Sequence, residues 1–506
     1  MNLAAALLAT ATSAPARPAL TGPDPVDFGH LAERAAWVAA AVSEQAPPAA
    51  RVAIVAGNET AFVAAYLGVL AAGAVAVPLN CASPSHELAG ELDAVDAALV
   101  LTSNEHADLA RRAASQRTTT VPAIIVGEGV ADPSAPPVDR DANDLAVLLF
   151  TAGTAGPPKP AMLTHGSLLA NLEQMQSHPG LRLTTGDVAL GVLPLFHVYG
   201  LNVVIGLALY AGASVSLVDH FHPAETLARL RADGVTVVAA VPAIYDAWLA
   251  LDDDAAPADS FARARLCVSG ATALAPETAA AMRARFGVVV HDGYGLTEAS
   301  PVVTTTAVAS EPRPQSVGPP LPGVEVRLVD ADGHAVLEGD PGEIVVRGPN
   351  VFAGYWNEPE ATAAVIVDGW LHTGDIAVAD ADGWLTLVDR AKDIIIVSGF
   401  NVYPGEVETA LRSHADIVDV AVAGEPHPRT GEAVVAYVVA RPGRNPDPVE
   451  LLRHAGRQLA RYKLPTRVEV VTELPRTLAG NVVRRELSSS PAGTRTRRPD
   501  ATTNPP

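Results

Sequence analysis

A repeated strand–helix–strand pattern constrains the fold of this chain most strongly. In "VAIVAGNETAFVAAYLGVLAAGAVAVPLN", residues 52–80, two apolar runs flank a stretch with Phe62, Tyr66 and Leu70 at helical spacing. Such a segment is typical of two parallel strands joined by a helix. Further apolar runs of strand length follow at 145–150, 213–218, 235–240 and 288–291. The pattern therefore predicts an α/β fold built on parallel sheets.

The pattern of apolar and turn residues changes in the last third of the chain. From about residue 324, short alternating strands separated by glycine-containing turns predict a small β subdomain. After residue 390, helical and strand patterns predict a compact α+β unit of roughly 100 residues. Because 506 residues exceed the roughly 250–300 that one core supports, we expect several domains. We predict a large N-terminal domain at 1–389, a smaller mobile C-terminal domain at 390–487 and a disordered tail at 488–506.

Charge and composition exclude several partner classes. The chain carries 56 acidic and 35 basic residues, a formal charge of -21, which repels nucleic acid and anionic membrane surfaces. No apolar run reaches the roughly 20 residues of a membrane span. The two cysteines, Cys81 and Cys267, have no CxxC or other ligand spacing, so neither a disulfide framework nor a zinc site is indicated. This composition fits a cytoplasmic protein with no nucleic-acid partner.

The first twenty residues, "MNLAAALLATATSAPARPAL", have the small and apolar residues of a signal peptide, but no basic residue precedes Arg17. We therefore expect an amphipathic first helix instead of an export signal.

A loop rich in glycine and threonine is the first candidate binding motif. "FTAGTAGPPKPAMLTH", residues 150–165, follows an apolar run and precedes a helical pattern, where backbone N–H groups can turn toward phosphate. It is not a Walker loop, because two prolines separate Gly156 from Lys159. A purely structural turn is the alternative interpretation.

Two further motifs contain oxygen ligands. "HDGYGLTEAS", residues 291–300, has Thr297 and Glu298 after a glycine-rich turn, and this pair could hold phosphate and Mg²⁺. A solvated turn with a capping threonine is the alternative. "WLHTGD" ends in Asp375 after a sharp turn, and Arg390 follows in "DRAKD". These two could bind the hydroxyls of a ribose, or could form a surface ion pair.

Taken together, these segments resemble the adenylate-forming superfamily of acyl-CoA synthetases, luciferases and peptide-synthetase adenylation domains. The resemblance runs from about residue 20 to residue 487. It includes "LPLFHVYG", "VSGATAL", "GEIVVRGPNVFAGYWNEPEAT" and "SGFNVYPGEVE". "MLTHGSLLANLEQM" is closer to fatty-acid and aryl-acid CoA ligases. The resemblance implies that a carboxylic acid and ATP give an acyl-adenylate, which a thiol of CoA or of a separate acyl carrier protein then attacks.

The resemblance also implies roles for individual residues. The phosphates of ATP would contact Thr151, Gly153, Thr154, Gly156 and Lys159. The adenine slot and acyl wall would include Gly270, Ala271, Asp292, Gly293 and Tyr294, and Gly295 would add to the nucleotide-binding residues. The remaining roles fall to Thr297 for the α-phosphate, Glu298 for Mg²⁺, Asp375 and Arg390 for ribose, Lys392 as the hinge of a rotating C-terminal domain, and Gly399 for the thiol tunnel. His197 would gate or orient the acyl group, with a satisfied interior histidine as the alternative.

The chain departs from the family pattern at two places. In the phosphate loop, Ala152 and Ala155 replace hydroxyl residues and Pro160 replaces glycine. Near the C-terminus, Asn481 stands where the pattern has a catalytic lysine. Loss of that cation would cost ~10²–10³ in adenylation rate, by analogy with the loss of one oxyanion donor. Neither Lys463 nor Arg484 nor Arg485 is an obvious replacement, because all three belong to the ordinary motifs.

The leading hypothesis is therefore an acyl-CoA synthetase-like ligase whose adenylation step is impaired or specialised. A non-catalytic protein that binds nucleotide or acyl-adenylate is an alternative from a different class. A ligase that passes the adenylate to a nucleophile other than a thiol is a third possibility.

Overall fold

The computed structural model describes residues 1–22, 24–117, 121–126, 129, 131, 135–151, 158–390, 393, 395–397, 400–427, 430–476, 482–489 and 495–497. The chain divides into two compact units. Unit 1 comprises Met1–Val326 and Val345–His372, and unit 2 comprises Arg327–Ile344 and Thr373–Pro506. The predicted boundary at residues 389 and 390 remains a prediction.

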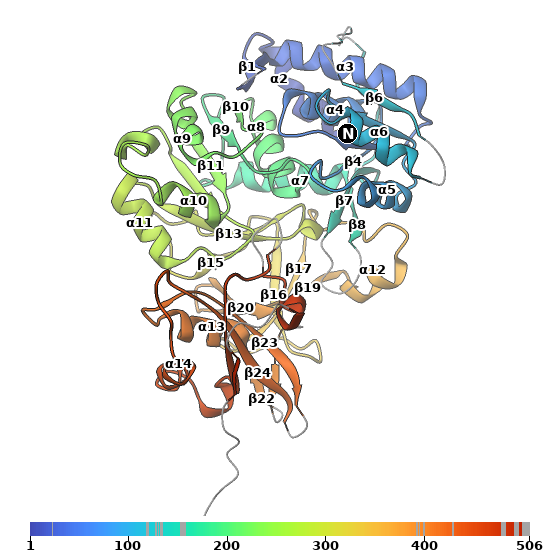
Figure 1. Ribbon diagram of the computed structural model, residues 1–506. Coiled ribbons are helices and arrows are strands. Elements are labelled where there is room, and N and C mark those ends of the chain that lie inside the picture. Colours follow the sequence, from blue (N-terminus) through green and yellow to red (C-terminus); the bar gives the residue numbers. More distant parts are fainter. Residues whose placement is uncertain are drawn as a thin grey trace, which may run out of the picture. The chain divides into compact units, whose positions relative to one another are not determined.

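Two largely parallel sheets form the framework of unit 1 (Figure 1). The first has the order β14-β13-β12-β11-β9-β10-β1-β2, in which β14 and β2 are antiparallel to their neighbours. The second has the order β6-β5-β3-β4-β7-β8, in which β8 is antiparallel. The strands of the first sheet are β1 Pro18–Thr21, β2 Val26–Asp27, β9 Val188–Gly191, β10 Ser214–Leu217, β11 Val237–Ala240, β12 Leu266–Ser269, β13 Val290–Gly295 and β14 Val302–Thr305. Those of the second are β3 Arg51–Val55, β4 Val75–Pro78, β5 Leu99–Thr102, β6 Ala123–Ile125, β7 Leu145–Thr151 and β8 Lys159–Thr164.

Helices connect and cover these strands, as the strand–helix–strand pattern predicts. They are α1 Leu3–Leu7, α2 Ala9–Ser13, α3 Phe28–Gln45, α4 Thr60–Ala71, α5 Ser85–Ala94, α6 Ala107–Ser115, α7 His165–Ser177, α8 Leu207–Tyr210, α9 Pro223–Ala232, α10 Pro242–Leu249, α11 Pro276–Phe286 and α12 Pro359–Val365. Short turns of helix are η1 Tyr199–Gly206, η2 Ala258–Phe261 and η3 Thr297–Ala299. Within the described residues, no helix combines the length and the apolarity needed to cross a bilayer.

Helix α4 is more deeply buried than its predicted apolar stripe suggests. Nearly all of its residues are buried, on every face, because the sheet covers one side and α3 lies along the other (Figure 1). Gly68 allows this close packing, since a Cβ at this position would lie 2.4 Å from the Cβ of Val38. A continuously apolar helix of this kind belongs in a core between layers.

The chain start forms two short helices where one amphipathic helix was predicted. The Asn2 side chain caps α1 and donates to the carbonyl oxygens of Leu70 and Val138. The backbone N–H of Leu3 donates to His165 Nδ1 at 3.1 Å. These contacts tie the first helix into the core of unit 1.

Unit 2 has its own sheet, with the order β22-β21-β24-β25-β26 and with β23 beside β24. Its strands are β21 Ile395–Val397, β22 Phe400–Val402, β23 Ile417–His427, β24 Gly431–Ala440, β25 Arg467–Val471 and β26 Arg495–Arg497. Its helices are α13 Pro404–Arg412, α14 Pro448–Ala455, η5 Arg461–Lys463 and η6 Arg484–Ser489. An apolar core around Val407, Val422 and Leu451 supports the predicted α+β fold. Part of the predicted disordered tail forms β26, and most of the rest of that tail lies outside the described residues.

The remaining strands correspond to the predicted β subdomain. They are β15 Ser316–Gly318, β16 Glu325–Val329, β17 Gly342–Arg347, β18 Ile366–Val367, β19 Trp370–Ala379 and β20 Leu385–Arg390. The division between the two units cuts three of these strands, β16, β17 and β19.

Candidate active site

The β7–β8 hairpin carries the predicted phosphate loop. Thr151 at the end of β7 pairs with Lys159 at the start of β8, and the Thr151 hydroxyl donates to the Lys159 carbonyl oxygen at 3.2 Å. Six of the seven connecting residues, 152–157, lie outside the described part of the chain, among them Gly153, Thr154 and Gly156. Because β7 runs parallel to β4, this loop begins at the carboxyl edge of the sheet, where parallel α/β folds bind ligands.

A strap formed by residues 348–356 connects β8 to η3. Its residue Trp356 donates its backbone N–H to the Pro160 carbonyl oxygen at 2.8 Å, and Met162 donates to Gly354 at 2.9 Å. At the other end of the strap, the Phe352 N–H donates to the Glu298 carbonyl oxygen at 2.8 Å. The strap therefore holds the predicted phosphate lysine and the predicted Mg²⁺ ligand in one local framework.

Tyr355 lies between these two predicted residues. Its hydroxyl group donates to Glu298 Oε1 at 2.7 Å, and Lys159 Nζ lies 5.8 Å from the centre of its ring. Burial raises the pKa of the Tyr355 hydroxyl, and the charge and hydrogen bond of Glu298 add to this effect. The phenol is therefore a permanent donor that holds one carboxylate oxygen of Glu298 in place.

Asn350, another residue of the strap, also fixes η3. It is fully buried, and its side-chain N–H group donates to the Ala299 carbonyl oxygen at 2.8 Å. Thr297 and Glu298 thus sit on a short helical turn that is anchored by two residues of the strap, Asn350 and Phe352.

The predicted adenine and acyl residues lie at the carboxyl ends of β12 and β13. Gly270 and Ala271 follow β12, and Ser269 is opposite Asp292 in the register of the two strands. The Tyr199 ring packs onto Gly270, where an added Cβ would lie 3.0 Å from Tyr199 Cε1. Burial raises the Asp292 pKa to about 7, so this carboxyl group is easily protonated in the folded protein.

The predicted glycine-rich turn before Thr297 is wrong. Residues 290–295 are strand β13, with Gly293 opposite Thr305 of β14. Gly295 is required by close packing, because a Cβ there would lie 2.2 Å from the Pro301 carbonyl oxygen. The motif ends a strand and presents Thr297 and Glu298 just beyond it.

His197 lies in the loop between β9 and η1. Its surface is exposed, yet removal of water by the surrounding atoms lowers the pKa of its imidazole. Because His197 is exposed, the alternative of a satisfied interior histidine is not observed. The ring is neutral at physiological pH.

In unit 2, the two predicted ribose-binding residues are opposite each other on paired strands. Asp375 of β19 is opposite Arg390 of β20 in antiparallel pairing. The predicted sharp turn before Asp375 is wrong, because "WLHTGD" is part of a strand with only a local distortion at Gly374, where φ is +72°. The Gly374 N–H donates to Glu343 Oε1 at 2.9 Å and fixes that distortion.

Three predicted residues of the C-terminal part, Lys392, Gly399 and Asn481, lie outside the described residues. Two cations that could replace a lysine at position 481 are described, and both have carboxylate partners. Lys463 Nζ contacts both oxygens of Glu406, at 2.6 and 2.7 Å. Arg484 bonds to Asp393 at 3.0 Å and to Glu408 at 2.8 Å. Unit 2 therefore uses these cations to hold its own elements together.

Sequence reasoning assigned no role to Tyr355 or Asn350. Both belong to the quoted segment "GEIVVRGPNVFAGYWNEPEAT", so the available signal was that segment's resemblance to a family motif. Their contacts to η3 join residues more than 50 positions apart, which local periodicity does not report.

Comparison with known proteins identifies the family. A family model described as AMP-binding enzyme matches residues 7–356, and one described as AMP-binding enzyme C-terminal domain matches residues 406–481. The chain is 39% identical to a long-chain-fatty-acid–CoA ligase of Bacillus subtilis over 353 residues, which are 70% of this chain and 62% of that protein. It is 38% identical to a feruloyl-CoA synthase of an Amycolatopsis species over 443 residues, 87% of this chain and 88% of that protein.

Among solved structures, ATP-bound MatB from Rhodopseudomonas palustris superposes with a TM-score of 0.89. It is 32% identical, and the match covers 96% of this chain and 98% of MatB. The two-domain α/β architecture of the sequence prediction is thereby confirmed. On this combination of fold, matched domains and relatives, the chain belongs to the AMP-binding enzyme family.

Proposed function

We propose that this chain is an AMP-forming ligase that joins an aliphatic or aryl carboxylic acid to CoA through an acyl-adenylate. Its relatives with the printed names long-chain-fatty-acid–CoA ligase and feruloyl-CoA synthase support both acid classes and favour CoA as the thiol. A separate acyl carrier protein is the alternative acceptor.

The grouping of Lys159, Tyr355 and Glu298 carries this proposal. It combines a cation suited to phosphate with a carboxylate held in position by a phenol. The Thr297 hydroxyl and the Glu298 carboxylate are oxygen donors, which fits the preference of Mg²⁺. When bound, Mg²⁺ neutralises negative charge on the phosphates of ATP.

The chemistry has two displacement steps. In the first, a carboxylate oxygen of the acid attacks the α-phosphorus of ATP, and the bond to pyrophosphate breaks. Lys159 and Thr297 bind phosphate oxygens, and neutral His197 orients the acyl group without adding charge beside the carboxylate. In the second, the thiol sulfur attacks the acyl carbonyl carbon, loses its proton to solvent and expels AMP. Asp375 and Arg390 hold the ribose throughout.

The two steps differ in how much of the family's machinery they retain. Asn481 replaces a cation that would stabilise the first step, and Lys463 and Arg484, which are close to it in sequence, already pair with carboxylates. We therefore propose that adenylation is slow relative to thioester formation. Rotation of the predicted C-terminal domain about Lys392, with Gly399 beside the thiol, would leave position 481 out of the second step.

The test measures the two half-reactions separately. Pyrophosphate release is followed with ATP, Mg²⁺ and a panel of aliphatic and aryl acids, and thioester formation is followed from a synthetic acyl-adenylate and CoA. We expect slow pyrophosphate release and rapid thioester formation. Failure of both reactions, with normal binding of AMP, would replace the ligase proposal with a binding role. Consumption of the adenylate by amines but not by CoA would indicate a non-thiol acceptor.

A further inference from the structure

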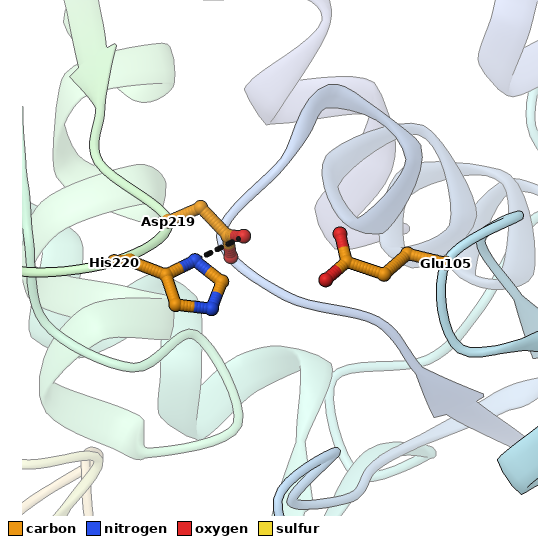
Figure 2. A group of neighbouring side chains, drawn as sticks. All are labelled: Glu105, Asp219 and His220. Atoms are coloured by element: carbon orange, nitrogen blue, oxygen red, sulfur yellow. Dashed lines mark ion pairs between the residues drawn. The ribbon is translucent and has the colours of Figure 1, made fainter.

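Three metal-ligating side chains converge at the carboxyl edges of the two sheets of unit 1. Glu105 lies beyond β5 of one sheet, and Asp219 and His220 lie beyond β10 of the other. Figure 2 shows the Glu105 carboxylate pointing across the gap toward Asp219 and His220. One ligand atom from each residue lies within 4.8 Å of the other two, although Glu105 is more than 110 positions away in sequence.

The chain holds Asp219 in a cradle that only glycine permits. A Cβ at Gly57 would lie 2.1 Å from Asp219 Oδ1, and the Asn58 backbone N–H donates to the same oxygen at 2.8 Å. The buried Asn58 side chain donates in turn to the carbonyl oxygens of Leu193 and Val218. The carboxylate is therefore fixed before any ligand arrives, which lowers the entropy cost of binding.

The surroundings of this carboxylate are negatively charged. Among the described residues, neither Glu105 nor Asp219 pairs with a lysine or an arginine, and His220 Nδ1 is the ion-pair partner of Asp219, at 2.8 Å. The half-buried thiol of Cys81 has its pKa raised to about 11 by burial first and then by the charges of Asp219, Glu59 and Glu105. A cation at this position would relieve the mutual repulsion of these carboxylates.

We propose that Glu105, Asp219 and His220 bind one Zn²⁺ ion. Two carboxylate oxygens and one imidazole nitrogen form a mixed set that zinc favours over the all-oxygen cations Mg²⁺ and Ca²⁺, and water completes the coordination. Tetrahedral bonds of about 2.0 Å place ligand atoms roughly 3.3 Å apart, so Asp219 Oδ2 and His220 Nδ1, which are 2.8 Å apart, must separate slightly to admit the ion. Glu105 and His220 are exposed and can change rotamer at little cost.

Such an ion would join the loop after β5 to the loop after β10 and so link the two sheets. Binding to the folded state alone would stabilise unit 1. This site is independent of the proposed ligase function, because it uses none of the residues assigned to ATP or Mg²⁺.

A second group offers a natural control. Asp330, Asp332 and His334 of unit 2 also have ligand atoms within 4.8 Å of one another. They lie within five consecutive residues, and Asp330 Oδ1 already accepts the backbone N–H groups of Asp332 and His334, both at 2.9 Å. This carboxylate closes its own turn, so we assign no site to the group.

The experiment titrates the full-length protein with ZnCl₂ in a calorimeter without nucleotide and repeats the titration with His220→Ala, Glu105→Gln and His334→Ala. The His220 side chain is 70% exposed, so its removal leaves the fold intact. We expect one site in the wild type and in His334→Ala, and at least ~10-fold weaker binding in the other two variants. We also expect Zn²⁺ to raise the unfolding temperature of the wild type but not that of His220→Ala.

Absence of Zn²⁺ binding by the wild type would overturn the proposal. Equal affinity in the wild type, His220→Ala and Glu105→Gln would do the same, as would binding that disappears only in His334→Ala. Unchanged Zn²⁺ affinity in Glu298→Gln is expected, and a loss there would place the ion at the proposed Mg²⁺ position instead.

Discussion

Lys159 of unit 1 and Lys463 of unit 2 have similar aromatic neighbours and different carboxylate partners. Each Nζ lies 5.8 Å from the centre of a tyrosine ring, Tyr355 for the first and Tyr462 for the second. Lys463 also bonds to both oxygens of Glu406. Lys159 has no hydrogen bond or ion pair through Nζ with any residue that the structure describes.

The difference follows from what each nearby carboxylate contacts. In unit 1, a phenol occupies one oxygen of Glu298, whereas in unit 2 the lysine itself satisfies Glu406. A lysine stays available to a phosphate when another donor holds the neighbouring carboxylate. By the same reasoning, Lys463 is not a free cation that could replace a lysine at position 481, because Glu406 already binds it.

The largest effect is expected from a substitution that restores the missing cation. Asn481→Lys should raise the rate of pyrophosphate release by about 10²–10³, because a positioned positive charge stabilises the charge that develops during adenylation. Thioester formation from synthetic acyl-adenylate should stay within about twofold of the wild type. Asn481→Gln is the matched control and should leave both rates near wild type. An equal gain in both half-reactions would mean that the residue acts on something shared by the two steps.

The next largest effect is expected from removal of the Lys159 side chain. Lys159→Ala should lower the rate of pyrophosphate release by about 10²-fold, since one charged phosphate contact disappears. Thioester formation from the pre-formed adenylate should be much less affected, because pyrophosphate is absent from that step. Stopped-flow or coupled assays of the two half-reactions measure the contrast.

Lys463→Ala is the counterpart of that variant in unit 2. The pair that it breaks is partly exposed, so we expect a loss of stability below about 1 kcal/mol and a small change in either half-reaction. A fall in adenylation as large as that of Lys159→Ala would show that Lys463 reaches the substrate, and the contrast between the two lysines would then fail.

The strand before Lys159 and the helix after it could be predicted from the sequence, whereas the contacts of Tyr355 and Glu298 could not. The apolar run at 145–150 and the helical pattern from residue 165 correspond to β7 and α7, but Lys159, which was interpreted as part of a loop, begins the antiparallel strand β8. The glycines of "HDGYG" were interpreted as a turn, but Gly295 is needed for close approach to the Pro301 carbonyl oxygen within paired strands. Tyr355 could not be assigned, because its partner Glu298 is 57 positions away and the strap that joins them depends on tertiary pairing with β8.

Removal of the Tyr355 hydroxyl group tests directly whether the phenol keeps Glu298 away from Lys159. In Tyr355→Phe, Glu298 loses a donor worth about 1.5–3 kcal/mol and can turn toward Lys159. We expect the KM for ATP in adenylation to rise about tenfold. In a Lys159→Ala background the same substitution should have a much smaller effect, since the released Glu298 carboxylate then has no lysine at position 159 to bind. Equal effects in both backgrounds would separate Tyr355 from the lysine.

Asp292 shows a third way to accommodate a carboxyl group, since burial raises its pKa to about 7 and it is held neutral by a proton at lower pH. In the unfolded chain it ionises near 3.8, so between these values the folded state binds one more proton. Its contribution to stability is therefore greatest at low pH and falls as pH rises from about 4 to 7. Asn at this position mimics the neutral form, so Asp292→Asn should be as stable as the wild type at pH 4. At pH 8 the variant should be more stable by ~1–2 kcal/mol. This is less than the free energy equivalent to the whole pKa shift, because the site is partly open to water. Urea unfolding of both proteins across this pH range measures the difference. A constant difference at all pH values would mean that Asp292 is ionised throughout, and that a cation or donor holds it as Lys463 holds Glu406.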